Sequence, residues 1–263
     1  MAKKRSTATR RADSQAASAR AAAIRREQER KERRRRSLVV SAVVVVVLVL
    51  IGAIAYGVQS SRDATNSSAA GASGPPSGTI GRYGVPAGPD SAPVKAVIYE
   101  DFICPYCGQF EAASRTMLQK DIDAGKLQIQ YHVLNFLDRS SSTKYSTRAA
   151  NALAVVLDTS GPKTAKRFHD LLFENQPQEG SAGLSDSQLV DFAVQAGAKK
   201  SEVESGIKNG EFDSWVAKVT DQASKDHVTG TPTVRIGGKD VPFTSAQGMA
   251  SQIQQAVDAA NKK

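Results

Sequence analysis

Two cysteines, Cys104 and Cys107, are the only cysteines in this chain of 263 residues, and only Pro105 and Tyr106 separate them. Thiols at this spacing can close into a disulfide and reopen, which is the chemistry of thiol–disulfide exchange. The pair cannot belong to a framework of structural disulfides, because the chain has no other cysteine to complete one. A purely structural bond between the two would stabilise the fold little, since it closes a very short loop.

Two metal-based alternatives for the pair remain, and the sequence favours neither. Zinc takes four ligands, yet the chain has no second cysteine pair, and its three histidines (His132, His169 and His227) are far apart in the sequence. A c-type haem would need a histidine directly after the second cysteine, where the chain has Gly108. We therefore expect redox chemistry at the two cysteines, with no metal ion and no cofactor.

The residues on either side of the pair predict a strand that leads into a helix. Residues 94–102 are rich in β-branched and aromatic side chains, as in a buried strand. After them, apolar residues recur at helical spacing: Cys107, Phe110, Ala113 and Met117. Pro105 suits the first turn of a helix, where its missing N–H is not needed.

This junction gives the two thiols different expected roles. The unpaired N–H groups and the dipole at a helix N-terminus favour an anion, and the thiolate is the attacking species in exchange. We therefore expect Cys104 to be the more exposed and more acidic thiol, which reacts with the substrate. Cys107 lies one turn inward and is expected to resolve the mixed disulfide.

The remaining patterns predict an α/β core with a helical insertion. Residues 127–133 alternate as a second strand, which completes a β-α-β unit around the cysteines. Strand patterns return only at 233–236 and 239–243, and a helix over 245–260 follows. Apolar residues at helical spacing fill the interval, which is too long for an ordinary crossover. We expect an inserted helical subdomain at about 140–228.

The N-terminal part of the chain differs from the rest in charge and hydropathy. Residues 1–36 hold 14 of the 35 Lys and Arg and 4 of the 26 Asp and Glu, so the rest of the chain is close to neutral. Residues 38–58 are uncharged and almost entirely apolar, long enough to cross a bilayer as one helix. The arginines before them predict a cytoplasmic tail and an extracytoplasmic domain. Residues 59–82 predict a flexible linker, and the folded domain is expected over 83–263.

Two alternatives apply to this N-terminal part. A cleaved signal peptide would have a shorter apolar region, usually about 7–15 residues. Nucleic-acid binding by the basic tail is disfavoured, because no aromatic residue is interleaved with the charges to stack on bases. We therefore expect a single-pass protein of the cell membrane with no nucleic-acid partner.

Three features together resemble the DsbA-like branch of the thioredoxin superfamily, in a membrane-anchored form. Residues 101–107 (DFICPYC) resemble its active-site segment, and residues 230–233 (GTPT) resemble its cis-proline loop. The helical insertion between these segments is the third feature. The resemblance implies a thioredoxin-like core in which Pro232 is cis, and in which Thr231 lies beside Cys104 with its backbone available to bind a substrate chain.

The chain departs from the best-known members of this branch at positions that affect redox chemistry. The strongly oxidising enzymes have Pro-His between the cysteines, whereas Pro105 and Tyr106 are the redox-tuning residues here. A buried acid often precedes the first cysteine by six residues, but Ile98 holds that place. Glu100 and Asp101 are the candidates to shuttle protons in place of that buried acid. In the alternative interpretation, both side chains only solvate the end of the strand.

The resemblance implies a monomeric enzyme that introduces disulfides into exported proteins. A membrane quinone-linked oxidase would then restore the enzyme's own disulfide. Two alternatives stay open: a membrane-tethered thiol reductase or electron relay, and a non-enzymatic adaptor module whose cysteines are incidental. The redox state of the pair in the cell distinguishes the oxidant from the reductase.

Overall fold

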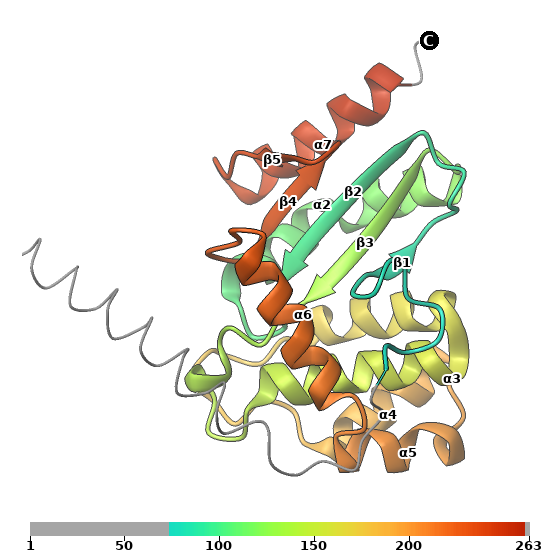
Figure 1. The fold of residues 1–263 in the computed structure, drawn as a ribbon, viewed down its shortest axis with the longest axis vertical. Coiled ribbons are helices and arrows are strands. Elements are labelled where there is room, and N and C mark those ends of the chain that lie inside the picture. Colours follow the sequence, from blue (N-terminus) through green and yellow to red (C-terminus); the bar gives the residue numbers. More distant parts are fainter. Residues whose placement is uncertain (1–73, 261–263) are drawn as a thin grey trace, which may run out of the picture. The chain divides into compact units, whose positions relative to one another are not determined.

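The structure, a computed structural model, describes residues 74–260 of the chain (Figure 1). These residues form a five-stranded sheet with helices packed around it. The strands are β1 (Val85–Ala87), β2 (Val94–Glu100), β3 (Leu127–Val133), β4 (Thr233–Ile236) and β5 (Lys239–Val241). The helices are α2 (Pro105–Asp123), α3 (Tyr145–Glu174), α4 (Asp186–Ala196), α5 (Lys200–Asn209), α6 (Asp213–Lys225) and α7 (Ala246–Ala260), with a short 3-10 helix at Asp138–Ser140.

The sheet has the strand order β1-β3-β2-β4-β5, in which β2 and β3 are parallel and the other pairs are antiparallel. Helix α2 joins β2 to β3, which confirms the β-α-β unit, and Figure 1 shows α2 behind the sheet and α6 in front of it. Strand β4 returns along β2 with Thr233 opposite Tyr99. The loop before β4 therefore lies beside the end of β2, where the cysteines follow.

The buried face of α2 is partly polar, which differs from the apolar face expected from the sequence. Phe110 is buried as predicted, but Ala113 and Met117 are only half-buried. Glu111 and Ser114 are buried in their place. The Ser114 hydroxyl is satisfied locally, because it donates to the Phe110 carbonyl at 2.7 Å. Glu111 has no such local partner and belongs to a polar cluster described below.

Helices α3 to α6 form the predicted insertion between β3 and β4. Helix α3 bends where Gly161 takes a φ of 77° and Pro162 follows, since proline cannot continue the helical hydrogen bonds. The buried amide of Asn151 ties the insertion together. Its Nδ2 donates to the Gly206 carbonyl at 3.2 Å, and its Oδ1 accepts from the Phe212 N–H at 2.7 Å. One side chain of α3 therefore holds both α5 and the start of α6.

Residues that precede Tyr83 also contact this domain, although the sequence predicts that the folded domain begins at Tyr83. The Ser77 N–H donates to the Asp158 carboxylate at 2.7 Å, and Ile80 pairs with Gly84 in an isolated β-bridge. These contacts place the last residues of the expected linker against the folded domain.

The predicted basic tail (1–36), the predicted membrane helix (38–58) and residues 59–73 of the predicted linker lie outside the described residues. Within residues 74–260, no helix has the length and apolar character needed to span a bilayer.

Candidate active site

Cys104 is the N-cap residue of α2, directly after the loop that follows β2. Its backbone is extended (φ −70°, ψ 117°), and its carbonyl accepts a hydrogen bond from the Gly108 N–H at 3.1 Å. Pro105 opens the helix, where a missing N–H costs nothing. Cys107 follows on the buried face of the helix. The expected strand-to-helix junction is confirmed.

The two cysteines are free thiols in different environments. Cys104 is 4% exposed and Cys107 is 0% exposed. Hydrogen bonds from the Cys107 thiol, from the Thr231 side chain and from nearby backbone N–H groups lower the pKa of Cys104 to about 6, although burial opposes them. Burial, together with the neighbouring Cys104, raises the pKa of Cys107 well above its ordinary value. At neutral pH Cys104 is therefore the thiolate and Cys107 the thiol, in the order of acidity expected.

The loop before β4 brings Thr231 against this thiolate. The Thr231–Pro232 peptide is cis, as predicted, and Cys104 Sγ lies 3.3 Å from the Thr231 carbonyl oxygen. Only the protonated thiol can donate to that carbonyl, so this one contact favours the neutral form of Cys104. Two segments 127 residues apart in the sequence thus meet at one sulfur atom.

Pro105 and Tyr106 are exposed beside the thiolate. Tyr106 is 57% exposed, and its ring centre lies 6.0 Å from that of Phe243, which is 48% exposed, in an edge-to-face arrangement. No motif marks Phe243 in the sequence; it lies in the segment between β5 and α7, which the fold brings beside Tyr106. The Tyr106 phenol carries no positive charge, unlike a protonated histidine at the same place.

Asp101 is buried and holds the loop before Cys104. Its Oδ1 accepts hydrogen bonds from the Ile103 N–H (3.1 Å) and the Ser146 hydroxyl (2.7 Å), and its Oδ2 accepts one from the Leu137 N–H (2.9 Å). Burial raises the pKa of Asp101 to about 7, against these three hydrogen bonds. Because both oxygens are occupied, Asp101 fits a positioning residue better than a proton shuttle.

Glu100 is also buried, so the alternative that both acids only solvate the strand end is wrong. Glu100 Oε1 lies 2.6 Å from His169 Nε2, and Glu100 Oε2 has no hydrogen-bond partner among the described residues. The charge of Glu100 contributes to the raised pKa of Cys107. Glu100 therefore interacts with both the buried thiol and a histidine of the insertion. In the sequence His169 is one polar residue on a helix, and nothing there marks its partner.

A second buried acid, Glu111, faces the same pair. Neither of its side-chain oxygens has a hydrogen-bond partner within residues 74–260, and burial raises its pKa to about 7. Burial alone would lower the pKa of His169, but the charge of Glu100 and hydrogen bonds to Asp170 and Glu100 raise it to about 9. The cluster therefore contains an imidazolium between carboxyl groups at neutral pH.

The donor atoms of Glu100, Glu111 and His169 lie within 4.8 Å of one another, which is the composition of a cation site. Two ligands of one tetrahedral zinc ion would lie about 3.3 Å apart at its usual bond lengths. Glu100 Oε1 and His169 Nε2 are closer, at 2.6 Å, and the charge of the imidazolium would repel a cation. These three side chains therefore fit a hydrogen-bonded acid–imidazole network better than a set of metal ligands.

Gln176, which follows α3, holds the active-site loop from the insertion side. Its Nε2 donates to the carbonyl oxygens of Phe102 (3.1 Å) and Cys104 (2.9 Å). Gly108 leaves room for this amide, because a Cβ at that position would overlap Gln176 Oε1. Sequence reasoning missed Gln176; a glycine directly after the second cysteine is the one local sign of a close neighbour.

Comparison with known proteins gives consistent matches to this fold. The family model described as Thioredoxin matches residues 82–259. The reduced DsbA from Mycobacterium tuberculosis is 28% identical, with a TM-score of 0.57 over 68% of this chain and 98% of that chain. The oxidised BdbD from Bacillus subtilis is 26% identical, with a TM-score of 0.57 over 73% of this chain and 99% of that chain.

Relatives found by comparison of sequences match part of this chain. Disulfide bond formation protein D of Bacillus subtilis (strain 168) is 29% identical over 154 residues, which are 58% of this chain and 67% of that protein. Serine/threonine-protein kinase PknE of Mycobacterium tuberculosis (strain ATCC 25618 / H37Rv) is 31% identical over 177 residues. That match covers 65% of this chain but only 31% of the kinase. The chain belongs to the thioredoxin family, and its described domain is a thiol–disulfide oxidoreductase of the DsbA type.

Proposed function

We propose that this enzyme introduces disulfides into exported proteins, with the Cys104–Cys107 disulfide as the oxidant. The observation that carries the proposal is the pKa of Cys104, which hydrogen bonds lower to about 6 at the N-terminus of α2. A thiolate at Cys104 exists only after reduction. Its stabilisation therefore favours the reduced enzyme and makes the enzyme's disulfide the stronger oxidant.

In the proposed reaction a substrate thiolate attacks Cys104 Sγ. The bond between the two enzyme sulfurs breaks, Cys107 leaves with the electron pair and takes up a proton, and a mixed disulfide joins Cys104 to the substrate. A second substrate thiolate then attacks the substrate sulfur of the mixed disulfide, and Cys104 leaves as the thiolate. The substrate has lost two electrons, and the enzyme has gained them.

Thr231 and Pro232 are the proposed binding residues for the substrate chain. The distance of 3.3 Å between the Thr231 carbonyl oxygen and Cys104 Sγ supports this role, since a chain paired with Thr231 would have its cysteine next to Cys104 Sγ. Tyr106 and Phe243 add exposed aromatic surface at this end of the domain. Apolar side chains close to the substrate cysteine would contact that surface.

We further propose that the enzyme is anchored in the cell membrane with its catalytic domain outside the cytoplasm. The apolar segment 38–58 and the basic segment 1–36 support this topology. Disulfides persist in that compartment, so an enzyme that donates them belongs there. A membrane quinone-linked oxidase is the proposed partner, which would accept two electrons and restore the Cys104–Cys107 disulfide.

Two measurements test the direction of the reaction. The oxidised full chain, purified in detergent, should restore activity to reduced and unfolded ribonuclease, whereas Cys104→Ser should not. In intact cells, alkylation with a mass tag should find the Cys104–Cys107 pair mostly disulfide-bonded. A mostly reduced pair would favour the reductase or electron relay. A protein that neither oxidises ribonuclease nor reduces insulin would favour the adaptor.

A further inference from the structure

Two separate segments form the proposed substrate surface around Cys104. The loop of residues 227–232, called the Thr231 loop below, brings the Thr231 carbonyl oxygen to 3.3 Å from Cys104 Sγ. The segment after β5 brings Phe243 to Tyr106, with 6.0 Å between the ring centres. Neither segment is a helix or a strand, so no regular backbone hydrogen bonding fixes where Thr231 and Phe243 lie. A side chain that holds both segments would therefore set the shape of this surface.

Arg235 is a side chain that reaches the base of both segments. It lies on β4, which follows the Thr231 loop, and its side chain is 18% exposed. Each nitrogen of its guanidinium has a different partner. Nη2 donates to the Asp226 carbonyl at 2.8 Å, Nη1 donates to the Tyr99 hydroxyl at 3.4 Å, and Nε donates to the Asp240 carboxylate. A planar guanidinium holds several partners at fixed angles, which the single ammonium of a lysine cannot do.

The contact with Asp226 closes the Thr231 loop at its base. Asp226 is the C-cap of α6, just before the loop, and Arg235 follows the loop on β4. The hydrogen bond between them therefore fixes how far apart the two ends of the loop lie. Thr233 adds a second contact, since its hydroxyl donates to the Gly230 carbonyl at 2.8 Å. These two hydrogen bonds hold the Thr231 carbonyl in one position beside the cysteines.

Tyr99 holds the guanidinium in place. Tyr99 lies on β2, is 4% exposed, and has its ring centre 5.2 Å from Arg235 Cζ, a cation–π contact. Strand β2 leads directly into the loop that carries Cys104. The arginine that holds the substrate segments is therefore fixed to the same strand that positions the reactive cysteine.

The contact with Asp240 orients β5, the strand that leads to Phe243. Asp240 lies directly opposite Arg235 in the antiparallel pair of β4 and β5. Strand β5 has three residues and lies at one edge of the described sheet, so its backbone pairs with β4 alone. The Asp240 side chain is 64% exposed, so the ion pair contributes orientation more than stability. Through Asp240, Arg235 therefore acts on the position of Phe243.

We propose that Arg235 is a positioning residue for substrate binding, which sets the positions of Thr231 and Phe243 relative to Cys104. The inference rests on the proposed function, in which a substrate chain pairs with Thr231 and contacts the exposed aromatic rings. Arg235 acts on the surface around the disulfide and not on the sulfur atoms. Its loss should therefore change which thiols the enzyme oxidises quickly, while the disulfide itself keeps its reactivity.

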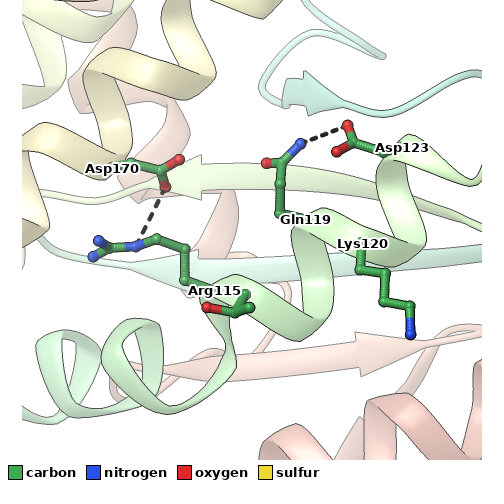
Figure 2. Close-up of a pocket in the computed structure, with 6 residues that line it drawn as sticks. Arg115, Gln119, Lys120, Asp123 and Asp170 are labelled. Atoms are coloured by element: carbon green, nitrogen blue, oxygen red, sulfur yellow. Dashed lines mark hydrogen bonds and ion pairs between the residues drawn. The ribbon is translucent and has the colours of Figure 1, made fainter.

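Arg115 on α2 offers a matched control for Arg235. Its side chain is 23% exposed and pairs with two carboxylates of α3, those of Glu174 and of Asp170, where Arg115 Nε lies 3.8 Å from Oδ1. Figure 2 shows Arg115 directed toward Asp170 at an open surface pocket of about 500 Å³. Neither carboxylate belongs to the Thr231 loop or to β5. Arg115→Lys thus removes a guanidinium of similar exposure whose partners lie outside the proposed substrate surface.

The test compares thiols that differ in how much of this surface they contact. The oxidised full chain, purified in detergent, is mixed with dithiothreitol or with one of two short peptides. The reaction is quenched with acid, and the free thiols of the enzyme are counted with a mass tag. Dithiothreitol is small enough to need only the disulfide. Each peptide has two cysteines, and the peptides differ only in whether Phe or Ser precedes the first cysteine. The variants are Arg235→Lys, Asp240→Asn and the control Arg115→Lys.

The wild type should oxidise the Phe peptide faster than the Ser peptide. Arg235→Lys should slow oxidation of the Phe peptide about tenfold, in line with the cost of misplaced binding groups. Its rate with dithiothreitol should stay within about twofold of the wild type. Asp240→Asn should lose the preference for Phe and keep the rate with the Ser peptide, because only the contact with β5 is removed. Arg115→Lys should match the wild type with all three thiols.

Three outcomes would overturn the role of Arg235 alone. These are an unchanged ratio of peptide to dithiothreitol rates in Arg235→Lys, an equal loss with all three thiols, and a wild type that does not prefer Phe. If Arg235→Lys does not fold, Asp240→Asn carries the test, because the Asp240 side chain is mostly exposed. A preference for Phe that survives in Asp240→Asn would then overturn the proposal. A wild type that oxidises none of the three thiols would overturn the proposed function as well.

Discussion

The side-chain amide of Gln176 lies 2.9 Å from the carbonyl oxygen of Cys104, so the helical insertion directly supports the cysteine expected to react with the substrate. The same amide donates to the carbonyl of Phe102. Both carbonyls lie in the loop between β2 and α2, where no neighbouring strand can satisfy them. The geometry around Cys104 therefore depends on a residue that is distant in the sequence, 72 positions from Cys104 and 74 from Phe102.

Replacing Gln176 with Ala should destabilise the protein by about 1–2 kcal/mol, because the Phe102 carbonyl loses its donor and the Cys104 carbonyl keeps only the Gly108 N–H. Urea unfolding of wild type and variant measures the difference. Asn175→Ala is the control, since the exposed Asn175 amide donates only within its own helix end, to the Leu171 carbonyl. An equal loss in the two variants would contradict the role given to Gln176.

Gly108→Ala should also destabilise the protein, although alanine favours a helix by about 1 kcal/mol over glycine. The reason is that a Cβ at this position would overlap the Gln176 side chain. Adding Gln176→Ala removes that overlap, so the double variant should lose less than the sum of the two single losses. Urea unfolding of all four proteins measures the coupling. Strictly additive losses would show that Gly108 and Gln176 do not interact.

The alkylation rate of reduced Cys104 should rise with pH about a midpoint near 6, because the thiolate is the reactive form. Cys107 should stay unreactive until well above pH 9. Cys107→Ala should raise the Cys104 midpoint, since the Cys107 thiol is the first cause of the lowered pKa. Cys107→Ser retains a donor and should shift it less. If Cys107 is alkylated first at low pH, the two roles are reversed.

His169 should make the oxidised protein less stable as the pH rises from 7 to 9. Its pKa is about 9 in the fold against 6.5 when unperturbed, so its contribution is complete below pH 6.5 and is lost as the pH rises through 9. The shift of about 2.5 units corresponds to at most about 3 kcal/mol. Urea unfolding across this range measures it, with the cysteines oxidised so that no thiol titrates. Glu111 and Asp101, with pKa values of about 7, change mainly below this window.

The matched control for this pH dependence is His132. Burial lowers the pKa of His132 to about 4, so His132 stays neutral from pH 7 to 9. His132→Gln should keep the slope of stability against pH, whereas His169→Gln should flatten it. A slope that survives His169→Gln would assign the effect to another group.

Tyr106→His should make the enzyme a stronger oxidant. A protonated imidazole next to Cys104 would stabilise the thiolate, and with it the reduced form. For the wild type we expect a reduction potential between roughly −270 mV and about −120 mV, the values for thioredoxin and DsbA. Equilibration with glutathione buffers measures both proteins. Tyr106→Phe keeps an uncharged ring and should leave the potential unchanged; a shift as large as that of histidine would exclude charge as the cause.

The parts of the fold that sequence patterns predict well are those with a local period. Strands β3 and β4 end where the alternation ends, and α7 begins one residue from its predicted start. The cysteine pair and the GTPT segment are local motifs too, and the structure brings Cys104 and Thr231 together. Strand β1 was missed, because three residues are too few to show an alternation.

The parts that sequence patterns could not predict are polar residues whose partners are distant in the chain. Glu111 lies on the buried face of α2, although its type favours the solvent side of a helix. What makes its burial tolerable is the imidazolium of His169, which comes from α3. Gln176 and Phe243 likewise have partners that are distant in the sequence, Cys104 and Tyr106. A helical period shows which face is apolar, but it carries no information about a charge that will face it from another element.

The bend of helix α3 at Gly161 and Pro162 has a consequence for protein engineering. The half before the bend carries Asn151, which organises the insertion, and the half after it carries His169, which pairs with the core acid Glu100. The insertion is therefore not a detachable module. A chimera that takes residues 140–228 from another protein would leave Glu100 without the imidazolium of His169. It would also lose the Gln176 amide, which donates to the Cys104 carbonyl. Grafts that keep the second half of α3 and exchange only α4 and α5 would leave both supports in place.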